Sequence, residues 1–163
     1  MTGGDLRSIG KVNELIRKIN NEADFNLLIE ALQSKERVIA MRAADAIEKI
    51  TLHRGEFLQP HKKKLLDLLH TATEKEIRWH LAQIIPRLAL TDPEIKVVSK
   101  KFSEWALDKK ESRIVRVNSI QGLFELTRSF PQMGSKMEAL LQELETENIP
   151  SLKARIKRLR KQH

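Results

Sequence analysis

Residues 77–88 read IRWHLAQIIPRL, and their pattern recurs on both sides at a fixed distance. Apolar or small residues occur at spacings of three and four, which place them along one helical face. The same pattern begins 38 residues earlier at Ile39 and 38 residues later at Val115. The corresponding positions are Ile39, Ile77 and Val115; Ala43, Leu81 and Ser119; Ala44, Ala82 and Ile120; Ala46, Ile84 and Gly122; Ile47, Ile85 and Leu123; Ile50, Leu88 and Leu126. A period near 40 residues predicts stacked pairs of helices.

The composition favours an all-α fold. Aromatic residues make up only 4% of the chain, and it contains 6 glycines and 5 prolines. Leu, Ile, Ala, Glu, Lys and Arg dominate, and these residues favour helix over strand. A length of 163 residues suits one domain with its own core. We therefore expect a single helical repeat domain that spans residues 1–163.

Amphipathic segments outside the 38-residue motif complete the predicted helical hairpins. Each hairpin pairs an outer helix with an inner helix that carries the motif. The expected outer helices are 24–33, 59–70, 92–107 and 135–146, and the inner helices are 36–53, 74–90, 112–129 and a terminal helix from Pro150. Residues 5–20 have no counterpart in the later repeats and predict an N-terminal capping helix. The repeats are then 21–55, 56–90, 91–130 and 131–163.

Residues that cap or break helices set the expected helix ends. Pro86 lies inside an inner helix, where proline should bend the helix or loosen its last turn. Gly55 suits a left-handed C-cap. The expected helix starts are Ser34 as an N-cap, Pro60 in a first turn, Asp92 as an N-cap before Pro93, and capping boxes at Thr73 with Glu76 and Ser135 with Glu138.

The net charge of +8 is concentrated at the C-terminal end. Residues 151–163 contain no acid and six of the 30 basic residues, whereas the first 150 residues carry 24 basic and 22 acidic residues. The six are Lys153, Arg155, Lys157, Arg158, Arg160 and Lys161. The terminal helix that carries these residues either caps the stack with a polar surface or contacts nucleic acid, an anionic membrane or an acidic protein. It has no aromatic residue for base stacking.

The sequence lacks the residues and motifs that several kinds of functional site require. The absence of cysteine removes disulfides and thiolate metal sites and fits a reducing compartment. No signal peptide or apolar run of membrane-spanning length is present, so we expect a cytoplasmic protein without a transmembrane segment. The five histidines lack metal-ligand spacing, and there is no phosphate-binding glycine loop. We expect no cofactor, no metal and no catalytic residue; Asp45 is the one candidate for a general base.

The inner helices resemble those of the HEAT-repeat family. Ile77-Arg78 and Val115-Arg116 match the Val-Arg opening of the family motif, and residues 43–50 match its body. The first copy has Ala40 in place of the arginine, and the fourth has Leu152-Lys153. The resemblance covers residues 21–160 and implies a right-handed α-solenoid of about four hairpins. It also implies that Arg78 and Arg116 tie down loop carbonyls or an acid of a neighbouring repeat.

Such stacks bind extended partners on the concave face that their inner helices line. The non-core positions of these helices form three rows: Arg42, His80 and Asn118; Asp45, Gln83 and Gln121; Lys49, Arg87 and Glu125. Trp79 borders them, either as an exposed anchor for a peptide or base or as a residue packed against the next repeat. We expect a non-catalytic scaffold that binds a protein through these residues.

Two alternative functions remain open at this point. One is a nucleic-acid-associated protein that uses the basic C-terminal helix. The other is a relative of the HEAT-like alkylpurine DNA glycosylases, which hold damaged DNA with concave aromatic, acidic and basic residues. This chain would offer Trp79, Asp45, Arg42 and Arg87 for that purpose. However, the glycosylase family has more repeats and a concave face that is more basic and more aromatic.

Overall fold

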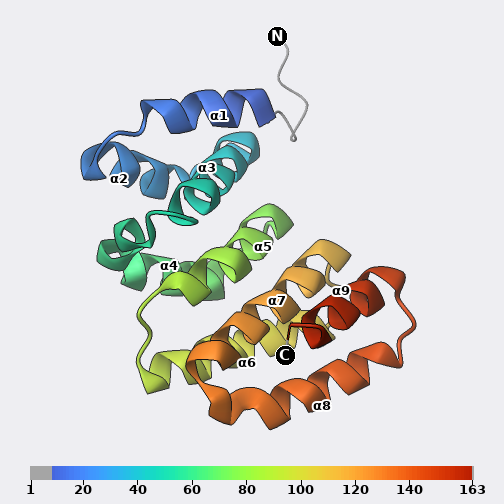
Figure 1. Ribbon diagram of the computed structural model, residues 1–163. Helices are drawn as coiled ribbons and strands as arrows, with labels where there is room; N and C mark the ends of the chain where they lie inside the picture. Colours follow the sequence, from blue (N-terminus) through green and yellow to red (C-terminus); the bar gives the residue numbers. More distant parts are fainter. Residues whose placement is uncertain (1–8, 163) are drawn as a thin grey trace.

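The structure is a computed structural model that describes residues 9–162 (Figure 1). Within this range it consists of α-helices and short 3-10 segments, which confirms the all-α prediction. The α-helices are α1 (Ile9–Lys18), α2 (Glu22–Ala31), α3 (Arg37–Thr51), α4 (Lys62–Thr71), α5 (Lys75–Ile84), α6 (Asp92–Leu107), α7 (Arg113–Ser129), α8 (Gly134–Glu145) and α9 (Pro150–Arg160). The 3-10 segments are η1 (Gly55–His61), η2 (Ile85–Arg87) and η3 (Pro131–Met133).

The helices form two layers. Helices α3, α5, α7 and α9 lie side by side in chain order, and we call them the inner layer (Figure 1). The outer helices α2, α4, α6 and α8 pack against α3, α5, α7 and α9, respectively. Helix α1 packs on α3 at the N-terminal end of the stack, as expected for a capping helix, although residues 5–8 of the predicted helix lie outside the described residues.

The motif residues of the inner helices form most of the core. Those of α5 and α7 are buried throughout, as predicted. In α3, however, Ile39 is 44% exposed, whereas Ala40 and Met41 are buried. The first turn of α3 therefore presents a different side to the core than α5 and α7 do. Among the apolar residues of the outer helices, Val97 of α6 is 45% exposed and Leu66 of α4 is half-buried.

Helix α7 lies very close to its neighbours at Gly122. A Cβ atom at this position would be 2.6 Å from the carbonyl oxygen of Ala82 in α5. It would also be 2.8 Å from Cε2 of Phe102 in α6. The small residue in the motif thus allows three helices to meet.

Pro86 affects its helix as expected. Helix α5 ends at Ile84, and the next three residues form the 3-10 segment η2. Arg87 is the last residue of this 3-10 segment.

Other helix ends differ from the prediction. Thr91, not Asp92, caps α6, and it forms a capping box with Glu94. Glu36, not Ser34, is the N-cap residue of α3. Gly55 does not adopt a left-handed conformation, because α3 already ends near Leu52 and Gly55 begins η1, which also contains Pro60.

The two capping boxes predicted at α5 and α8 do not form. Their N-cap residues are Glu74 and Met133, and neither makes a side-chain capping bond. The glutamates of both predicted boxes bind arginines instead: Glu76 binds Arg37, and Glu138 binds Arg160. Ion pairs between separate helices have replaced local capping.

Candidate functional site

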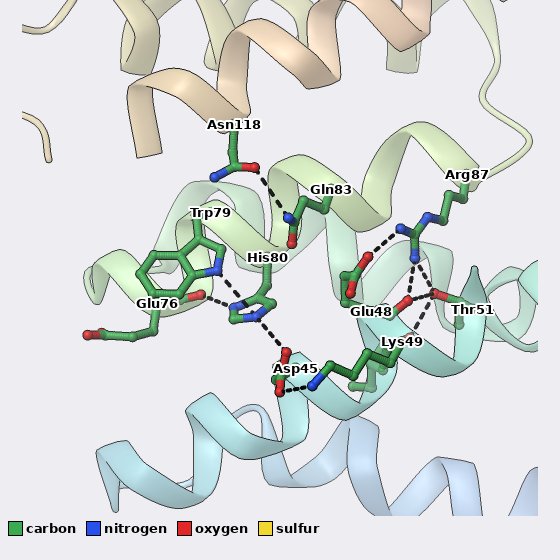
Figure 2. Close-up of polar contacts among 11 residues, drawn as sticks. Asp45, Glu48, Lys49, Thr51, Glu76, Trp79, His80, Gln83, Arg87 and Asn118 are labelled. Carbon is green, nitrogen blue, oxygen red and sulfur yellow. Dashed lines mark hydrogen bonds and ion pairs between the residues drawn. The ribbon is translucent and has the colours of Figure 1, made fainter. Parts of the chain in front are cut away.

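The residues predicted to bind a partner lie on α3, α5, η2 and α7. Figure 2 shows those of α3, α5 and η2 from Asp45 to Arg87, together with Asn118 of α7. We define this polar band as Arg42, Asp45, Lys49, Trp79, His80, Gln83, Arg87, Asn118, Gln121 and Glu125. Most of these side chains contact one another or their close neighbours. These contacts form separate small groups, and some of the groups repeat from one pair of inner helices to the next.

One polar contact between neighbouring inner helices occurs three times. Asp45 of α3 faces His80 of α5, with Oδ1 3.7 Å from Nε2 (Figure 2). Gln83 of α5 donates from Nε2 to Oδ1 of Asn118 in α7 over 3.2 Å. The third contact involves Gln121 of α7, which accepts a 3.1 Å hydrogen bond from Arg155 of α9.

These three contacts join equivalent positions. Asp45, Gln83 and Gln121 are separated by 38 residues each, as are His80 and Asn118, whereas Arg155 follows Asn118 by 37. The sequence placed these residues in separate rows. The structure shows that each residue of the middle row bonds or faces a residue on the next inner helix, so we call these contacts the inter-helix clasps.

His80 is held on both ring nitrogens. Its Nδ1 lies within hydrogen-bonding distance of the carbonyl oxygen of Glu76. Because a carbonyl oxygen can only accept, Nδ1 carries the proton in this contact. The indole nitrogen of Trp79 donates to Nε2 over 3.2 Å, and the two rings lie 5.1 Å apart between centroids (Figure 2). Nε2 of His80 thus faces both the indole N–H of Trp79 and Oδ1 of Asp45.

Asp45 also forms an ion pair within its own helix. Lys49 Nζ lies 2.9 Å from Oδ2 of Asp45, one helical turn away. The contact with His80 lowers the pKa of the Asp45 carboxyl, burial acts in the opposite direction, and the pair with Lys49 lowers it further. The net result is a pKa below the ordinary value for aspartate. A carboxylate of lowered pKa is a weaker base, which argues against Asp45 as a general base.

Arg87 extends from η2 back to α3. It donates to Oε1 of Glu48 over 2.7 Å, to the Glu48 carbonyl over 2.6 Å and to Oγ1 of Thr51 over 2.8 Å (Figure 2). The sequence did not identify Glu48 or Thr51 as partners of Arg87, because the residue of α3 at the position equivalent to Arg87 is Lys49. The signal that would have found Glu48 is its separation of 39 residues from Arg87, which also separates Arg37 from Glu76.

The polar band is less exposed than its sequence pattern indicated. His80 and Asn118 are only 5% and 8% exposed, which corrects the assignment of both to the non-core surface. Each lies between two inner helices, where it makes a clasp. The other eight residues are half-buried. Arg42 differs from them because its Nε and Nη2 atoms are buried and have no hydrogen-bond partner in the described part of the chain.

The arginines of the motif have the role that the resemblance implied. Arg78 donates to the carbonyl oxygen of Ala72 over 2.8 Å and pairs with Glu111 in the loop before α7. Arg116 repeats this arrangement: it donates to the carbonyl of Ala106 over 2.8 Å and to both carboxylate oxygens of Glu147. Each arginine therefore ties its own hairpin to the loop of the next one.

Three of the six basic side chains between residues 153 and 161 bond other side chains, but only Arg160 among them pairs with acids. Arg155 bonds Gln121, Lys153 donates to Asn148, and Arg160 pairs with both Glu138 and Glu145. Burial, and then the charge of Arg158, lower the pKa of Arg155. The remaining basic residues are exposed and have no ion pair within residues 9–162: Lys157, Arg158 and Lys161.

Neither a metal centre nor a membrane-spanning helix is present among residues 9–162. No group of three or more potential ligand side chains there is arranged to hold a metal ion. None of the described helices combines the length and the apolar character needed to cross a bilayer.

Stacked helical hairpins, a repeated arginine and repeated contacts between inner helices define a class of helical repeat protein. The family model for the HEAT repeat domain matches residues 5–163, so the chain belongs to the HEAT repeat family. HEAT repeats are commonly protein-interaction scaffolds, and the family is generally non-catalytic. The chain matched no curated protein and no solved structure.

Proposed function

We propose that this chain is a non-catalytic scaffold that binds a protein partner through the polar band. The proposal treats the chain as a right-handed solenoid of four hairpins, 21–55, 56–90, 91–130 and 131–163, that acts in the cytoplasm. The observation that carries it is the set of inter-helix clasps. They hold side chains of both charges in fixed positions, and a surface that is ordered before binding loses less entropy when a partner docks.

An apolar strip beside the polar band supports the same proposal. Trp79 of α5 and Val117 of α7 occupy equivalent positions 38 residues apart, and both are half-buried. Ile114, one turn before Val117, is 41% exposed. Interfaces combine an apolar centre, often with a tryptophan, and a polar rim. The strip supplies the first component and the polar band supplies the second. Trp79 thus offers part of its ring while its nitrogen stays bound to His80.

The two alternative functions receive less support. Nucleic-acid binding would depend on α9, where three of the six basic side chains are held by other residues. The glycosylase alternative needs free charged groups on the inner layer. Arg87 is held by Glu48 and Asp45 by Lys49, which leaves only Arg42 of the three charged residues named for it, and two nitrogens of Arg42 are buried.

Site-specific photo-crosslinking in native lysate tests the proposed face. The crosslinking amino acid replaces Gln83 or Glu125 in the polar band, and Lys110 or Gln142, which are exposed elsewhere, serve as matched controls. We expect one protein to crosslink at both band positions and at neither control. The same protein on all four positions, or none at the band positions, would contradict the proposal.

A gel-shift titration at low salt tests the rival function. The variant Lys157→Glu with Arg158→Glu and Lys161→Glu removes the free charges of α9. DNA binding by the unaltered chain that disappears in this variant would favour the nucleic-acid function over the protein scaffold.

A further inference from the structure

The outer layer contains a groove that shares no residue with the polar band. It has a volume of about 440 Å³ and lies between α6, the end of α7, η3 and α8. Helices α6 and α8 both pack against α7, but they make little direct contact with each other. The groove, which we call the α6–α8 groove, follows from that separation.

The floor of the α6–α8 groove is apolar. Ile95 of α6 and Leu123 of α7 form one part of it, and both are buried. The other part comes from η3 and α8, which contribute Met133, Met137 and Leu140. Methionine side chains are flexible and polarizable, so a surface that contains them adapts to apolar side chains of different shapes.

Lysines surround this apolar floor on two sides. Lys96 and Lys100 lie one turn apart on α6, and Lys136 lies on α8. All three are exposed, and no ion pair engages them within residues 9–162. By contrast, Lys49 and Lys62 pair with acids. Among the residues that the structure describes, Asp92 is the only acid that lines the groove, so the rim carries excess positive charge.

The hydroxyl groups of the groove add little to its specificity. Ser99 donates to the carbonyl oxygen of Lys96, and Ser103 donates to that of Ser99. Both protons are therefore used inside α6. Recognition by this groove depends on apolar contact in the floor and on positive charge at the rim.

We propose that the α6–α8 groove binds a short, acidic, amphipathic helix from a protein partner. Apolar residues at i, i+3, i+4 and i+7 enter the groove, as in other complexes of a helix with a groove. Acidic side chains one turn apart on that helix are about 5–6 Å apart, which matches the spacing of Lys96 and Lys100 on α6. A single fatty acid has one carboxylate and would leave two of the three lysines unpaired.

A displayed library of random 14-residue peptides is the probe for this site. Selection uses the full chain, and enriched peptides are then titrated against variants by fluorescence polarisation. The groove variant combines Lys96→Glu, Lys100→Glu and Lys136→Glu. The control variant combines Lys75→Glu, Lys109→Glu and Lys110→Glu, which changes the net charge equally at exposed lysines elsewhere.

We expect enriched peptides to be acidic with apolar residues at helical spacing. The groove variant should weaken their binding about tenfold or more, and the control variant should change it less than about twofold, because rim charges act mainly over short distances in salt. Ser99→Trp, which fills the groove from α6 without altering its charge, should also abolish binding. Circular dichroism checks that each variant is folded.

Several results would overturn the proposal. They are the absence of enriched peptides, enrichment of peptides without acids, and equal binding to the groove and control variants. Binding of palmitate that Ser99→Trp abolishes, without any enriched peptide, would assign the groove to a lipid instead. Because the groove and the polar band share no residue, none of these results decides the proposed function of the polar band.

Discussion

Replacing Gly122 with alanine places a methyl group where α5, α6 and α7 meet. The added Cβ would lie 2.6 Å from the carbonyl oxygen of Ala82, whereas carbon–oxygen contacts normally begin near 3.3 Å. Helix α5 or α7 would therefore have to move by about 0.7 Å. Phe102, at 2.8 Å, blocks the other side and is itself fully buried. Neither neighbour can move without disturbing the core.

Two opposing effects decide the size of the change. Alanine is favoured over glycine inside a helix by about 1 kcal/mol. Overpacking of a tight core costs about 1–3 kcal/mol, and a clash with backbone puts this case near the upper end. We expect Gly122→Ala to lower the free energy of unfolding by about 2 kcal/mol. For a chain of this size, that corresponds to a melting temperature about 4–8 °C lower.

Thermal and urea denaturation followed by circular dichroism measures this change. The matched control is Gly134→Ala at the start of α8, where no atom lies within 4 Å of the added Cβ. The control should be unchanged or slightly more stable. If Gly122→Ala is as stable as the unaltered chain, then α5 and α7 do not approach as closely as described here.

Three further substitutions test the charged groups of the stack. Arg116→Met should lower the free energy of unfolding by about 3–5 kcal/mol, because it leaves Glu147 unpaired near a buried site, and a double-mutant cycle with Glu147→Gln measures the coupling. Arg42→Met should leave stability unchanged or raise it by about 1 kcal/mol in urea denaturation, since two of its nitrogens are buried without partners; a large loss would reveal a partner for them. Asp45 has a lowered pKa, so its contribution to stability is present above its ordinary pKa of about 4 and disappears as the pH falls through its folded value. Asp45→Asn should therefore reduce stability at pH 7 and flatten its decline below pH 4, and a parallel decline in both proteins would argue against this role.

The repeat was predictable from sequence because packing between neighbours imposes it. A 38-residue spacing identified the inner helices and the positions of their core residues, Gly122 included. Pro86 acted as expected because its effect on a helix is local. The repeat is a regular pattern, and the effect of a proline depends only on residues close to it in the chain. Both can therefore be recognised from the sequence alone.

The contacts of the polar band were harder to predict because they depend on how each helix is rotated. His80 has the same helical position as Arg42, yet His80 is buried against α3 and Arg42 remains half-buried. Glu76 matched a local capping signal, but Arg37 from another helix binds it. Capping preferences describe a residue within its own segment. They cannot predict an ion-pair partner on another helix, which comes close only when the chain folds.

The arginines between repeats are increasingly shielded from water toward the C-terminus. The exposed fraction of the side chain falls from 48% for Arg37 to 28% for Arg78 and 2% for Arg116. Ion pairs in water contribute little, and breaking buried ones is costly. Each inner helix contacts mainly its immediate neighbours, so the stability of such a stack depends on its successive junctions.

The α3–α5 junction also contains Arg87, which is 21% exposed and binds Glu48, so both of its arginines are more exposed than Arg116. The junctions therefore differ in how well their ion pairs are shielded from water. The stack should open from its N-terminal hairpin while the α7–α9 end stays folded, and amide hydrogen exchange should be fastest in α2 and slowest in α7. A partner that bridges α3 and α5 would then slow exchange most at the weakest junction. A partner bound across α3 and α5 would therefore stabilise the whole stack by preventing it from opening at its N-terminal hairpin.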